Sequence, residues 1–373
     1  MLIFPNAVWK RPTNQRRVIV RVAETCEINQ TYFIKMKPAK KNEIKKEDAV
    51  EELNFDLSLR PSRWEDYVGQ ENVKNNLRLI VDAAKGRGET CDHLLFYGQP
   101  GLGKTTLAYL VGKEMGANIK STSGPALEKT GDIAALLTNL EPNEILFIDE
   151  AHRVNTMVEE ILYPAMESRK LHLIVGKGPS ARTFSLDLPP FTIIAATTKA
   201  NLLSAPLRSR FGATFRLDYY TPKDLERIIL RSAKLLNVSV LPEATKLISE
   251  ASRFTPRSAN RLLKRARDYA QIYLNNVINE EAVRKTLDLL EIDSLGLDET
   301  DRQLLTAIID KFNGGPVGLK ALGASLNEEP GTIEDVYEPF LMKLGLLNRT
   351  QGGRTATELA YEHLGFKKKG GLV

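Results

Sequence analysis

The sequence predicts an α/β protein, in which a parallel sheet with a phosphate-binding loop is followed by two smaller, mainly helical domains. Three observations lead to this prediction. Short apolar runs alternate with amphipathic helical patterns up to about residue 220, which is typical of a parallel sheet covered by helices. A glycine-rich loop, Gly98 to Thr105, lies between one apolar run and one helical pattern. Beyond Tyr220 the patterns are helical, apart from one short hairpin near the C-terminus.

The composition indicates a globular protein of two or three domains. The chain has 373 residues, of which 42% are hydrophobic and 27% are charged. Its two cysteines, Cys26 and Cys91, are too few for a disulfide framework or a zinc site, which favours a reducing cytoplasm. Because no apolar stretch is long enough to cross a membrane and the N-terminus lacks a secretory pattern, we expect a cytoplasmic protein with no membrane partner. The net charge of +5 permits contact with nucleic acid but does not indicate it.

Residues 1–58 are predicted to form an N-terminal extension. Its Lys-rich part, from Lys37 to Glu52, has too few apolar residues to fold and is expected to be disordered. Residues 1–35 are basic and leave two interpretations open. In the first, translation starts at Met36, so that this segment is never made. In the second, the segment is a basic arm that binds DNA.

The glycine-rich loop fits the phosphate-binding pattern G-x-x-x-x-G-K-[ST]. The run Leu94 to Tyr97 before it predicts a buried strand, and a helix is expected from Thr106 onward. In that setting, backbone N–H groups and the helix N-terminus surround the phosphates. We expect Lys104 to reach the β- and γ-phosphates and the hydroxyl of Thr105 to bind Mg²⁺.

Two adjacent carboxylates follow a second apolar run, Ile145 to Ile148. Downstream of a phosphate-binding loop, Asp149 is the expected second group that holds Mg²⁺, directly or through water. Glu150 is the expected general base that polarises the attacking water. His152 completes the string Asp-Glu-Ala-His, but the partner motifs of helicases with that string are missing, and no second metal ligand lies at a usable spacing.

An Arg-x-Arg-Phe element, from Arg208 to Phe211, follows a third buried strand, Thr192 to Thr198. Near a subunit edge, such an arginine stabilises the phosphoryl group transferred in a neighbouring subunit. The alternative is an ordinary pair of surface arginines. A hairpin is predicted at 171–190, with exposed apolar residues, and it is either a local cover or a docking arm. The remaining elements expected in this region are Gln70–Lys85, Ile119–Thr122, Asp132–Leu140 and Glu159–Glu167.

The C-terminal part is predicted to contain two domains. Helices at Lys223–Leu236, Pro242–Arg253, Ser258–Leu274 and Asn279–Leu290 form the first domain, and Thr255-Pro256-Arg257 offers an anion site at a helix N-terminus. Residues 295–373 form the second, with helices at Asp301–Phe312, Gly318–Leu326 and Thr332–Leu344 before a hairpin at Leu346–Ala356. Three helices and a hairpin indicate a winged helix, whose wing carries Arg349 and Arg354 where DNA phosphates would be met.

The whole arrangement resembles an AAA+ ATPase, with a large domain at 59–220, a helical lid at 221–294 and the winged helix at 295–373. From about Leu59 to Gly365 it resembles the RuvB family of Holliday junction branch migration motors. The matching segments are Arg60-Pro61, Tyr67 to Gln70, Thr122 to Lys129, Gly178 to Arg182, Ala196 to Thr198, Arg257 to Leu262 and Ile333 to Phe340.

The resemblance implies roles for individual residues. Lys104, Asp149, Glu150 and Arg210 are implied to be catalytic, with Arg210 the finger offered to the neighbouring subunit and Arg208 the second choice. Thr197 or Thr198 is implied to be the first sensor. Nucleotide contacts are implied for Leu59, Arg60, Gly101, Gly103, Lys104, Thr105, Thr106, Glu167, Ser168, Arg169, Thr197, Thr198, Arg210, Tyr220 and Arg257.

The resemblance also implies a function. It is that of an ATP- and Mg²⁺-dependent hexameric ring on duplex DNA, which drives branch migration in recombination, repair and the SOS response. RuvA is the implied partner at hairpin 171–190, and the RuvC resolvase acts indirectly. Two other functions share part of this pattern, namely a clamp-loader-like ATPase and a winged-helix transcription regulator that uses ATP as a switch.

Overall fold

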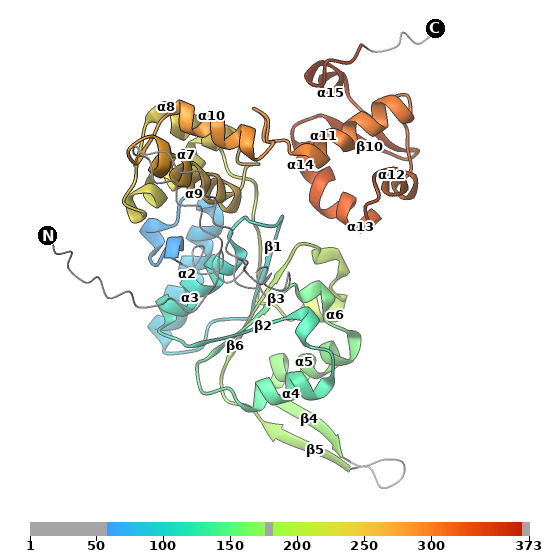
Figure 1. The fold of residues 1–373 in the computed structure, drawn as a ribbon. Coiled ribbons are helices and arrows are strands. Elements are labelled where there is room, and N and C mark those ends of the chain that lie inside the picture. Colours follow the sequence, from blue (N-terminus) through green and yellow to red (C-terminus); the bar gives the residue numbers. More distant parts are fainter. Residues whose placement is uncertain (1–57, 176–181, 368–373) are drawn as a thin grey trace, which may run out of the picture. The chain divides into compact units, whose positions relative to one another are not determined.

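The large domain is built on a parallel five-stranded sheet. The computed structural model describes residues 58–175 and 182–367 (Figure 1). The expectations for residues 1–57 therefore lie outside the described residues. The strand order is β2-β3-β6-β1-β7, and every neighbouring pair is parallel. The strands are β1 (Leu94–Tyr97), β2 (Ile119–Ser123), β3 (Ile145–Asp149), β6 (Thr192–Thr197) and β7 (Ala213–Arg216).

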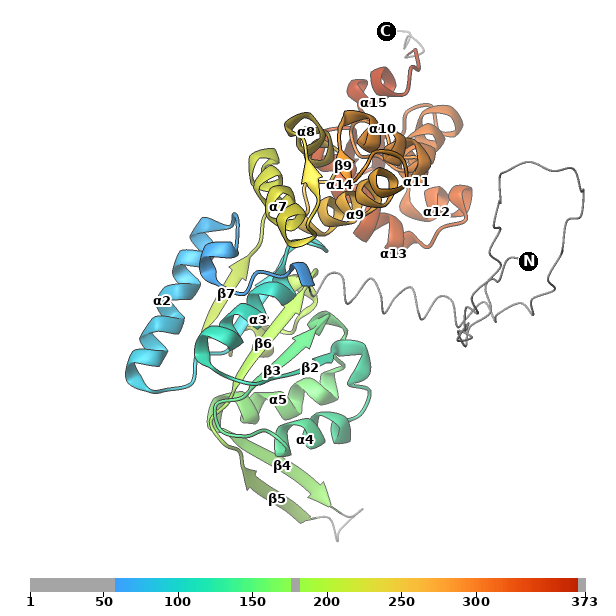
Figure 2. The same ribbon diagram turned by 60° about the vertical axis from the view of Figure 1, so that its left-hand side comes forward.

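Successive side chains of the central strands enter two separate cores, because side chains alternate between the faces of a sheet. Leu94 and Phe96 of β1 belong to one core, and Leu95 belongs to the other. The helices α2 and α3 cover the first face, and α4 and α5 cover the second (Figure 2). These helices are α2 (Glu71–Arg87), α3 (Lys104–Met115), α4 (Thr130–Thr138), α5 (Thr156–Ser168) and the short α6 (Ala205–Arg208).

The predicted hairpin is present as β4 (Lys170–Val175) and β5 (Arg182–Asp187). The turn between them, 176–181, lies outside the described residues. Leu171 is fully buried in the second core of the large domain, whereas Phe184 and Leu186 are about half exposed, at 51% and 44%. The apolar face of the hairpin therefore begins in the core and continues into solvent.

The lid contains four helices, as the sequence predicts. Its apolar stripes join the same core as α2 and α3, so that the lid and this face of the large domain share one hydrophobic interior. The helix α8 ends at Glu250, three residues before the predicted end at Arg253, and Arg253 and Phe254 adopt left-handed backbone conformations. The lid elements are α7 (Pro222–Leu235), β8 (Ser239–Val240), α8 (Pro242–Glu250), α9 (Pro256–Tyr273), β9 (Val277–Ile278) and α10 (Glu280–Leu289).

The C-terminal domain has the predicted helices and hairpin around a core of its own. Two of the helices contain π-helical turns, η6 (Ala307–Lys311) and η7 (Ile333–Tyr337). The other elements are α11 (Glu299–Thr306), α12 (Leu319–Leu326), α13 (Pro330–Thr332), α14 (Glu338–Lys343), β10 (Leu347–Thr350), β11 (Gly353–Ala356) and α15 (Glu358–His363).

Short elements at the margins were missed by the sequence patterns. Strand β7 pairs with β1 alone, and two of its four residues, Thr214 and Arg216, are exposed, so it does not read as a buried apolar run. The strands β8 and β9 have two residues each, and α15 has six. Within the two described ranges, no helix combines the length and the apolar composition that a membrane span requires.

Candidate nucleotide site and nucleic-acid interface

The phosphate-binding loop closes the carboxyl end of β1 and leads into α3. Gly98 and Gly101 have φ values of 147° and 80°, which only glycine adopts without strain. A Cβ atom at Gly98 would lie 2.5 Å from the carbonyl oxygen of Leu217, so this position also lacks room for a side chain. Thr105 and Thr106 follow in the first turn of α3. The backbone is thus shaped as a cradle at a helix N-terminus, where anions bind.

Lys104 is buried beneath this loop. Its ammonium donates hydrogen bonds to the carbonyl oxygens of Gly98 and Gln99, at 2.8 and 2.9 Å. Burial lowers the pKa of Lys104 to about 8, while nearby Asp149 acts in the opposite direction and Arg257 adds to the lowering. A buried cation held by neutral carbonyl groups is a site that an anionic phosphate would stabilise.

The hydroxyl of Thr105 and the carboxylate of Asp149 come together as the sequence predicts. Thr105 Oγ1 donates to Asp149 Oδ2 at 3.3 Å. The carboxylate also accepts a hydrogen bond from the backbone N–H of Glu150, at 2.8 Å, which fixes its orientation. Two oxygen ligands beside a phosphate cradle fit Mg²⁺, which usually takes one or two protein oxygens and completes its shell with phosphates and water. No larger cluster of His, Cys, Asp and Glu suited to a metal occurs in the described parts of the chain.

Glu150 lies at the end of β3 in a left-handed conformation, with φ 48° and ψ 42°. Its side chain is half exposed and accepts a hydrogen bond from Arg153 at 3.2 Å. Non-glycine residues in this region of backbone space are often found at functional sites, where the surroundings impose the strain. The carboxylate is therefore accessible to water next to the Thr105–Asp149 pair.

The two candidate sensors at the end of β6 have different surroundings. Thr197 is 1% exposed, and its hydroxyl contacts His152 Nδ1 at 3.0 Å and accepts a hydrogen bond from the N–H of Lys199 at 3.0 Å. Burial, as the largest effect, lowers the pKa of His152, so the ring is neutral at pH 7 and its Nδ1 can accept the Thr197 proton. Thr198 is only partly buried. Both hydrogen-bonding functions of the Thr197 hydroxyl are thus taken up within the protein, by His152 and by the backbone of Lys199.

The lid closes over the loop through Tyr220 and the start of α9. The Tyr220 hydroxyl donates to Tyr67 Oη at 3.2 Å and lies 3.4 Å from the carbonyl oxygen of Leu102. A Cβ at Gly101 would lie 3.2 Å from Cβ of Arg257, so the loop and the helix are in direct contact. Burial raises the pKa of Tyr220 to about 12, and the hydroxyl keeps its proton. Tyr220, Gly101 and Arg257 therefore lie close together at the phosphate-binding loop.

Leu59 and Arg60 lie between the large domain and the lid. Arg231 of α7 donates to the carbonyl oxygens of Leu59 and Arg60 at 2.8 and 3.4 Å, and the Arg60 guanidinium lies 5.0 Å from the ring centroid of Tyr109 on α3. These contacts place Arg60 beside the helix that follows the phosphate-binding loop and tie both residues to the lid.

Arg210 lies near the amino ends of the parallel strands, whereas the phosphate-binding loop lies at their carboxyl ends. Gly212, two residues on, donates its N–H to the carbonyl oxygen of His93, directly before β1, whereas the loop begins directly after β1. A four-residue strand spans roughly 13 Å. Arg210 is paired there with Glu167 at 2.9 Å, and its guanidinium lies over the ring of Tyr163. Arg208 is exposed.

The segment Glu167 to Arg169 lies at the same end of the strands. His93 Nε2 lies 3.2 Å from the carbonyl oxygen of Met166, just before the segment. The implied nucleotide contacts of Glu167, Ser168 and Arg169 therefore stay a prediction, and within this chain the segment lies with Arg210, near the amino ends of the strands.

The wing carries the two arginines that were predicted to contact DNA. Arg349 and Arg354 are cross-strand partners in the hairpin, yet their environments differ. The Arg349 side chain is half exposed and pairs with Glu334 at 2.7 Å. Arg354 is buried and makes two hydrogen bonds to Glu338, at 2.6 and 3.1 Å. In this structure Arg354 therefore fixes the wing to α14, and of the two wing arginines Arg349 is the more accessible.

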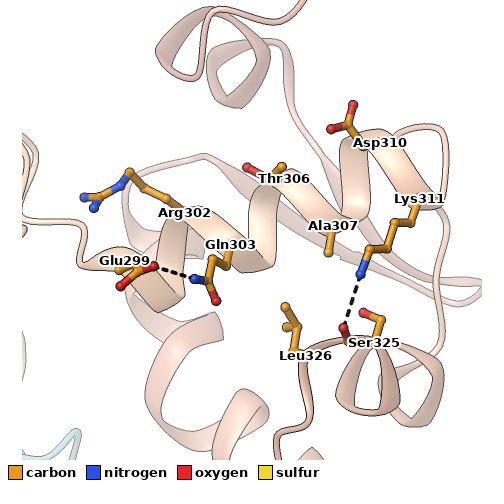
Figure 3. A pocket seen from close by; sticks show the side chains of 9 residues that line it. All are labelled: Glu299, Arg302, Gln303, Thr306, Ala307, Asp310, Lys311, Ser325 and Leu326. Carbon is orange, nitrogen blue, oxygen red and sulfur yellow. Dashed lines mark hydrogen bonds between the residues drawn. The ribbon is translucent and has the colours of Figure 1, made fainter.

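The winged-helix domain also has a shallow hollow of about 430 Å³ between α11, η6 and the end of α12 (Figure 3). Lys311 donates across it to the carbonyl oxygen of Ser325 at 3.3 Å, and Gln303 donates to Glu299 at 2.7 Å. Charged residues of both signs line the hollow, and their polar atoms partly satisfy one another. None of the residues predicted to bind nucleotide or DNA takes part.

Two residues of the site were missed by the sequence analysis. His152, which supports Thr197, was considered only as a metal ligand or a helicase signature. Tyr67, which meets Tyr220, is fully buried, and burial raises its pKa well above the usual value. Each partner is distant along the chain, at 45 and 153 residues respectively, so no local spacing could have revealed the pair.

The fold and the site define a P-loop ATPase of the AAA+ class with an appended winged helix. Three family models match consecutive parts of the chain. They are the Holliday junction DNA helicase RuvB P-loop domain at residues 59–217, the RuvB AAA lid domain at 220–293 and the RuvB C-terminal winged helix domain at 294–365.

Solved structures agree with these matches. The Holliday junction branch migration motor RuvB of Thermotoga maritima is 49% identical, with a TM-score of 0.77 over 83% of this chain and 99% of that one. Two variants of the same Thermotoga protein match with the same identity and coverage, at TM-scores of 0.77 and 0.76. The chain belongs to the RuvB family.

Proposed function

We propose that this protein is an ATP-driven motor that moves double-stranded DNA through Holliday junctions as a homohexameric ring. The observation that carries the proposal is the separation of two half-sites within one chain of the RuvB family. Lys104, Thr105 and Asp149 lie at the carboxyl ends of the strands, and Arg210 lies near their amino ends. Since Arg210 cannot reach its own phosphate-binding loop, a neighbouring subunit must supply the arginine.

Within each site the residues have distinct tasks. Lys104 binds the phosphates, and Thr105 and Asp149 hold Mg²⁺. When bound, Mg²⁺ neutralises phosphate charge and orients the terminal phosphoryl group. Glu150 accepts the proton of the attacking water, after its carboxylate leaves Arg153.

Thr198 is the better candidate for the first sensor, because the hydroxyl of Thr197 is already used by His152 and Lys199. Arg210 breaks its ion pair with Glu167 and binds the phosphoryl group of the nucleotide in the neighbouring subunit. This exchange is feasible because Glu167 is largely exposed, at 67%, so breaking the pair leaves no buried charge. Glu167, Ser168 and Arg169 then belong to the neighbour's nucleotide site.

The winged helix supplies the DNA contact. Arg349 is the proposed phosphate ligand, because its side chain is half exposed and its partner Glu334 lies near the surface. Neutralising a few phosphates per subunit gives binding that is independent of sequence and sensitive to salt.

The hairpin β4–β5 is the proposed docking surface for RuvA. Phe184 and Leu186 lie two residues apart on one strand face, and both are exposed. Isolated exposed apolar residues are ordinary, but here they extend a buried stripe outward from the core. The RuvC resolvase would then act on the same junction without contacting this chain. A role in recombination, repair and the SOS response, in the cytoplasm, follows from this proposal.

The test is dissociation of a labelled synthetic four-way junction by the purified protein with ATP, Mg²⁺ and RuvA, with linear duplex as the control. We expect ATP-dependent dissociation that is absent with Lys104→Ala. ATP turnover without any junction dissociation would contradict the proposed substrate and leave the ATPase assignment intact.

A further inference from the structure

The loop between α8 and α9 has an unusual backbone. Arg253 and Phe254 are consecutive non-glycine residues with φ values of 54° and 55°. An arginine and a phenylalanine adopt this region only when the surrounding structure imposes it, unlike asparagine, which tolerates it. The contacts of these two side chains show what imposes it.

The Arg253 side chain leaves the lid and enters the winged-helix domain. Its Nη1 lies 3.0 Å from a carboxylate oxygen of Asp298 and 3.0 Å from one of Asp301, and its guanidinium lies 4.4 Å from the ring centroid of Phe340. Phe254 meets the same Phe340 ring edge-on, with centroids 6.2 Å apart. One aromatic ring and two carboxylates of the winged-helix domain therefore hold both left-handed residues.

The ion pair between Arg253 and Asp301 includes a buried carboxylate. The Asp301 side chain is fully buried. Burial raises the pKa of Asp301 to about 7, and the guanidinium of Arg253 is the main influence in the opposite direction. The charge on this carboxylate near neutral pH therefore depends on Arg253 remaining in place, and the contact is geometrically strict.

The other end of the same loop contacts the phosphate-binding loop. A Cβ at Gly101 would lie 3.2 Å from Cβ of Arg257 and 3.4 Å from Cβ of Thr255, the N-cap of α9. Between the two ends, the carbonyl oxygen of Phe254 accepts a hydrogen bond from the N–H of Tyr220 at 3.0 Å. Five consecutive residues thus connect the nucleotide cradle with the interior of the winged-helix domain.

We propose that residues 253–257 transmit movement of the lid at the nucleotide to the winged helix, with Arg253 as the positioning residue at the receiving end. The inference rests on the proposed function and adds the connection between hydrolysis and DNA movement. Arg257 and the N-terminus of α9 move when the phosphates at the loop change. The strained conformation of Arg253 and Phe254 makes the connecting loop rigid, so that this movement reaches the winged-helix domain. A merely structural contact would stabilise the two domains without affecting how much DNA moves for each ATP.

The test compares junction dissociation per ATP hydrolysed, in the full-length protein with RuvA. The main variant is the double substitution Arg253→Met with Asp301→Asn, which removes both charges and leaves no buried carboxylate unpaired. Arg253→Lys is the second variant, because it keeps the charge but loses the planar, stacked geometry. Arg284→Met is the matched control, since Arg284 lies on the exposed face of α10 and pairs with Glu280 of the same helix at 2.7 Å.

We expect ATP hydrolysis by both Arg253 variants to stay within about threefold of the unchanged protein, while junctions dissociated per ATP fall roughly tenfold for the double variant and less for Arg253→Lys. The Arg284→Met control should match the unchanged protein in both measurements. Unaltered dissociation per ATP in the double variant would overturn the inference. So would a proportional loss of both activities, which indicates a structural role.

A second measurement separates this inference from the proposed function. Fluorophores at Lys285→Cys on α10 and Lys320→Cys on α12, in a chain with Cys26→Ser, report the distance between lid and winged helix. We expect energy transfer to differ between ATP-analogue and ADP states, and the difference to disappear in the double variant. If the unchanged protein hydrolyses ATP but dissociates no junction, the proposed function fails, and this measurement alone decides the inference. An identical nucleotide-dependent change in the double variant would then refute it.

Discussion

The two ends of the parallel strands carry the two proposed halves of the ATPase site, and these differ in how their cations are held. At the carboxyl ends of the strands, the Lys104 ammonium is buried and donates hydrogen bonds to two neutral carbonyl groups, with the carboxylate of Asp149 nearby. At the amino ends, Arg210 already has a carboxylate partner, Glu167, on the surface. The first half-site is prepared for an anion, and the second must exchange one anion for another. On the proposed function, nucleotide binding therefore depends on the first half-site alone, and the second acts only once subunits assemble.

Substitution of Arg210 tests this difference most strongly. We expect Arg210→Ala to lower ATP turnover of the pure protein by roughly 10³- to 10⁵-fold, as for other arginine fingers. Mixing it with Lys104→Ala, which is also inactive, should restore turnover, because each Lys104→Ala subunit still offers its Arg210 to a neighbour with an intact loop. The measurement is steady-state ATP hydrolysis as a function of mixing ratio.

Arg208→Ala is the matched control for that experiment, because Arg208 is exposed and lies two residues away. It should turn over ATP at nearly the unchanged rate and should rescue Lys104→Ala no better than the unchanged protein does. Mixtures of Arg210→Ala and Lys104→Ala that stay inactive, although they assemble, would show that Arg210 does not act across a subunit boundary.

Substitution of Glu150 separates nucleotide binding from hydrolysis within the first half-site. We expect Glu150→Gln to lower the rate of ATP hydrolysis by roughly 10²- to 10⁴-fold, because the amide cannot accept the proton of water. ATP affinity should remain within a few-fold, since Lys104 and the backbone cradle are untouched. Binding of a fluorescent ATP analogue and single-turnover hydrolysis measure the two quantities. Glu160→Gln, an exposed position on α5, is the control, and turnover in Glu150→Gln equal to that in this control would remove Glu150 from the catalytic role.

The wing adds a third kind of cation, the guanidinium of Arg354, which is buried and already paired with Glu338. Arg354→Ala leaves Glu338 buried without its partner, and we expect a loss of about 3–5 kcal/mol in the free energy of unfolding. Arg349→Ala should leave stability almost unchanged, because its pair with Glu334 is largely solvated. It should instead weaken duplex binding and reduce the salt slope by about 1. Chemical denaturation and salt-dependent binding measure these effects, and equal losses of stability would contradict the structural distinction between the two arginines.

These contrasts show what the sequence could and could not predict. The proximity of Thr105 to Asp149 was predictable, because the loop before α3 and the acidic pair Asp149–Glu150 each come at the carboxyl end of a short apolar strand, and the carboxyl ends of parallel strands converge. The grouping of Glu167 with Arg210 depends on which end of the strands each loop returns to, and local spacing does not encode that. The burial of Arg354 was not predicted, because an alternating hairpin pattern does not say which face packs against a helix. Arg253 gave no signal, since its partners Asp298 and Asp301 lie 45 and 48 residues away.

The smallest expected effect concerns the protonation of Lys104. Burial lowers its pKa from 10.5 to about 8, so below pH 8 the ammonium is charged and ready for phosphate, and above pH 8 the empty site loses the proton. A bound polyphosphate favours the charged form, so nucleotide binding above pH 8 must take up a proton. We expect ATP affinity to be constant between about pH 6.5 and 7.5 and to fall by up to about tenfold per pH unit above pH 8.

Lys104→Arg separates this effect from other titrating groups, because a guanidinium keeps its charge throughout that range. Its ATP affinity should be weaker than that of the unchanged protein but independent of pH up to about 9.5. Calorimetry in two buffers of different ionisation enthalpy at pH 8.5 should show proton uptake for the unchanged protein and none for Lys104→Arg. Equal proton uptake in both proteins would assign the titration to another group, and the buried ammonium would then be charged before the nucleotide arrives.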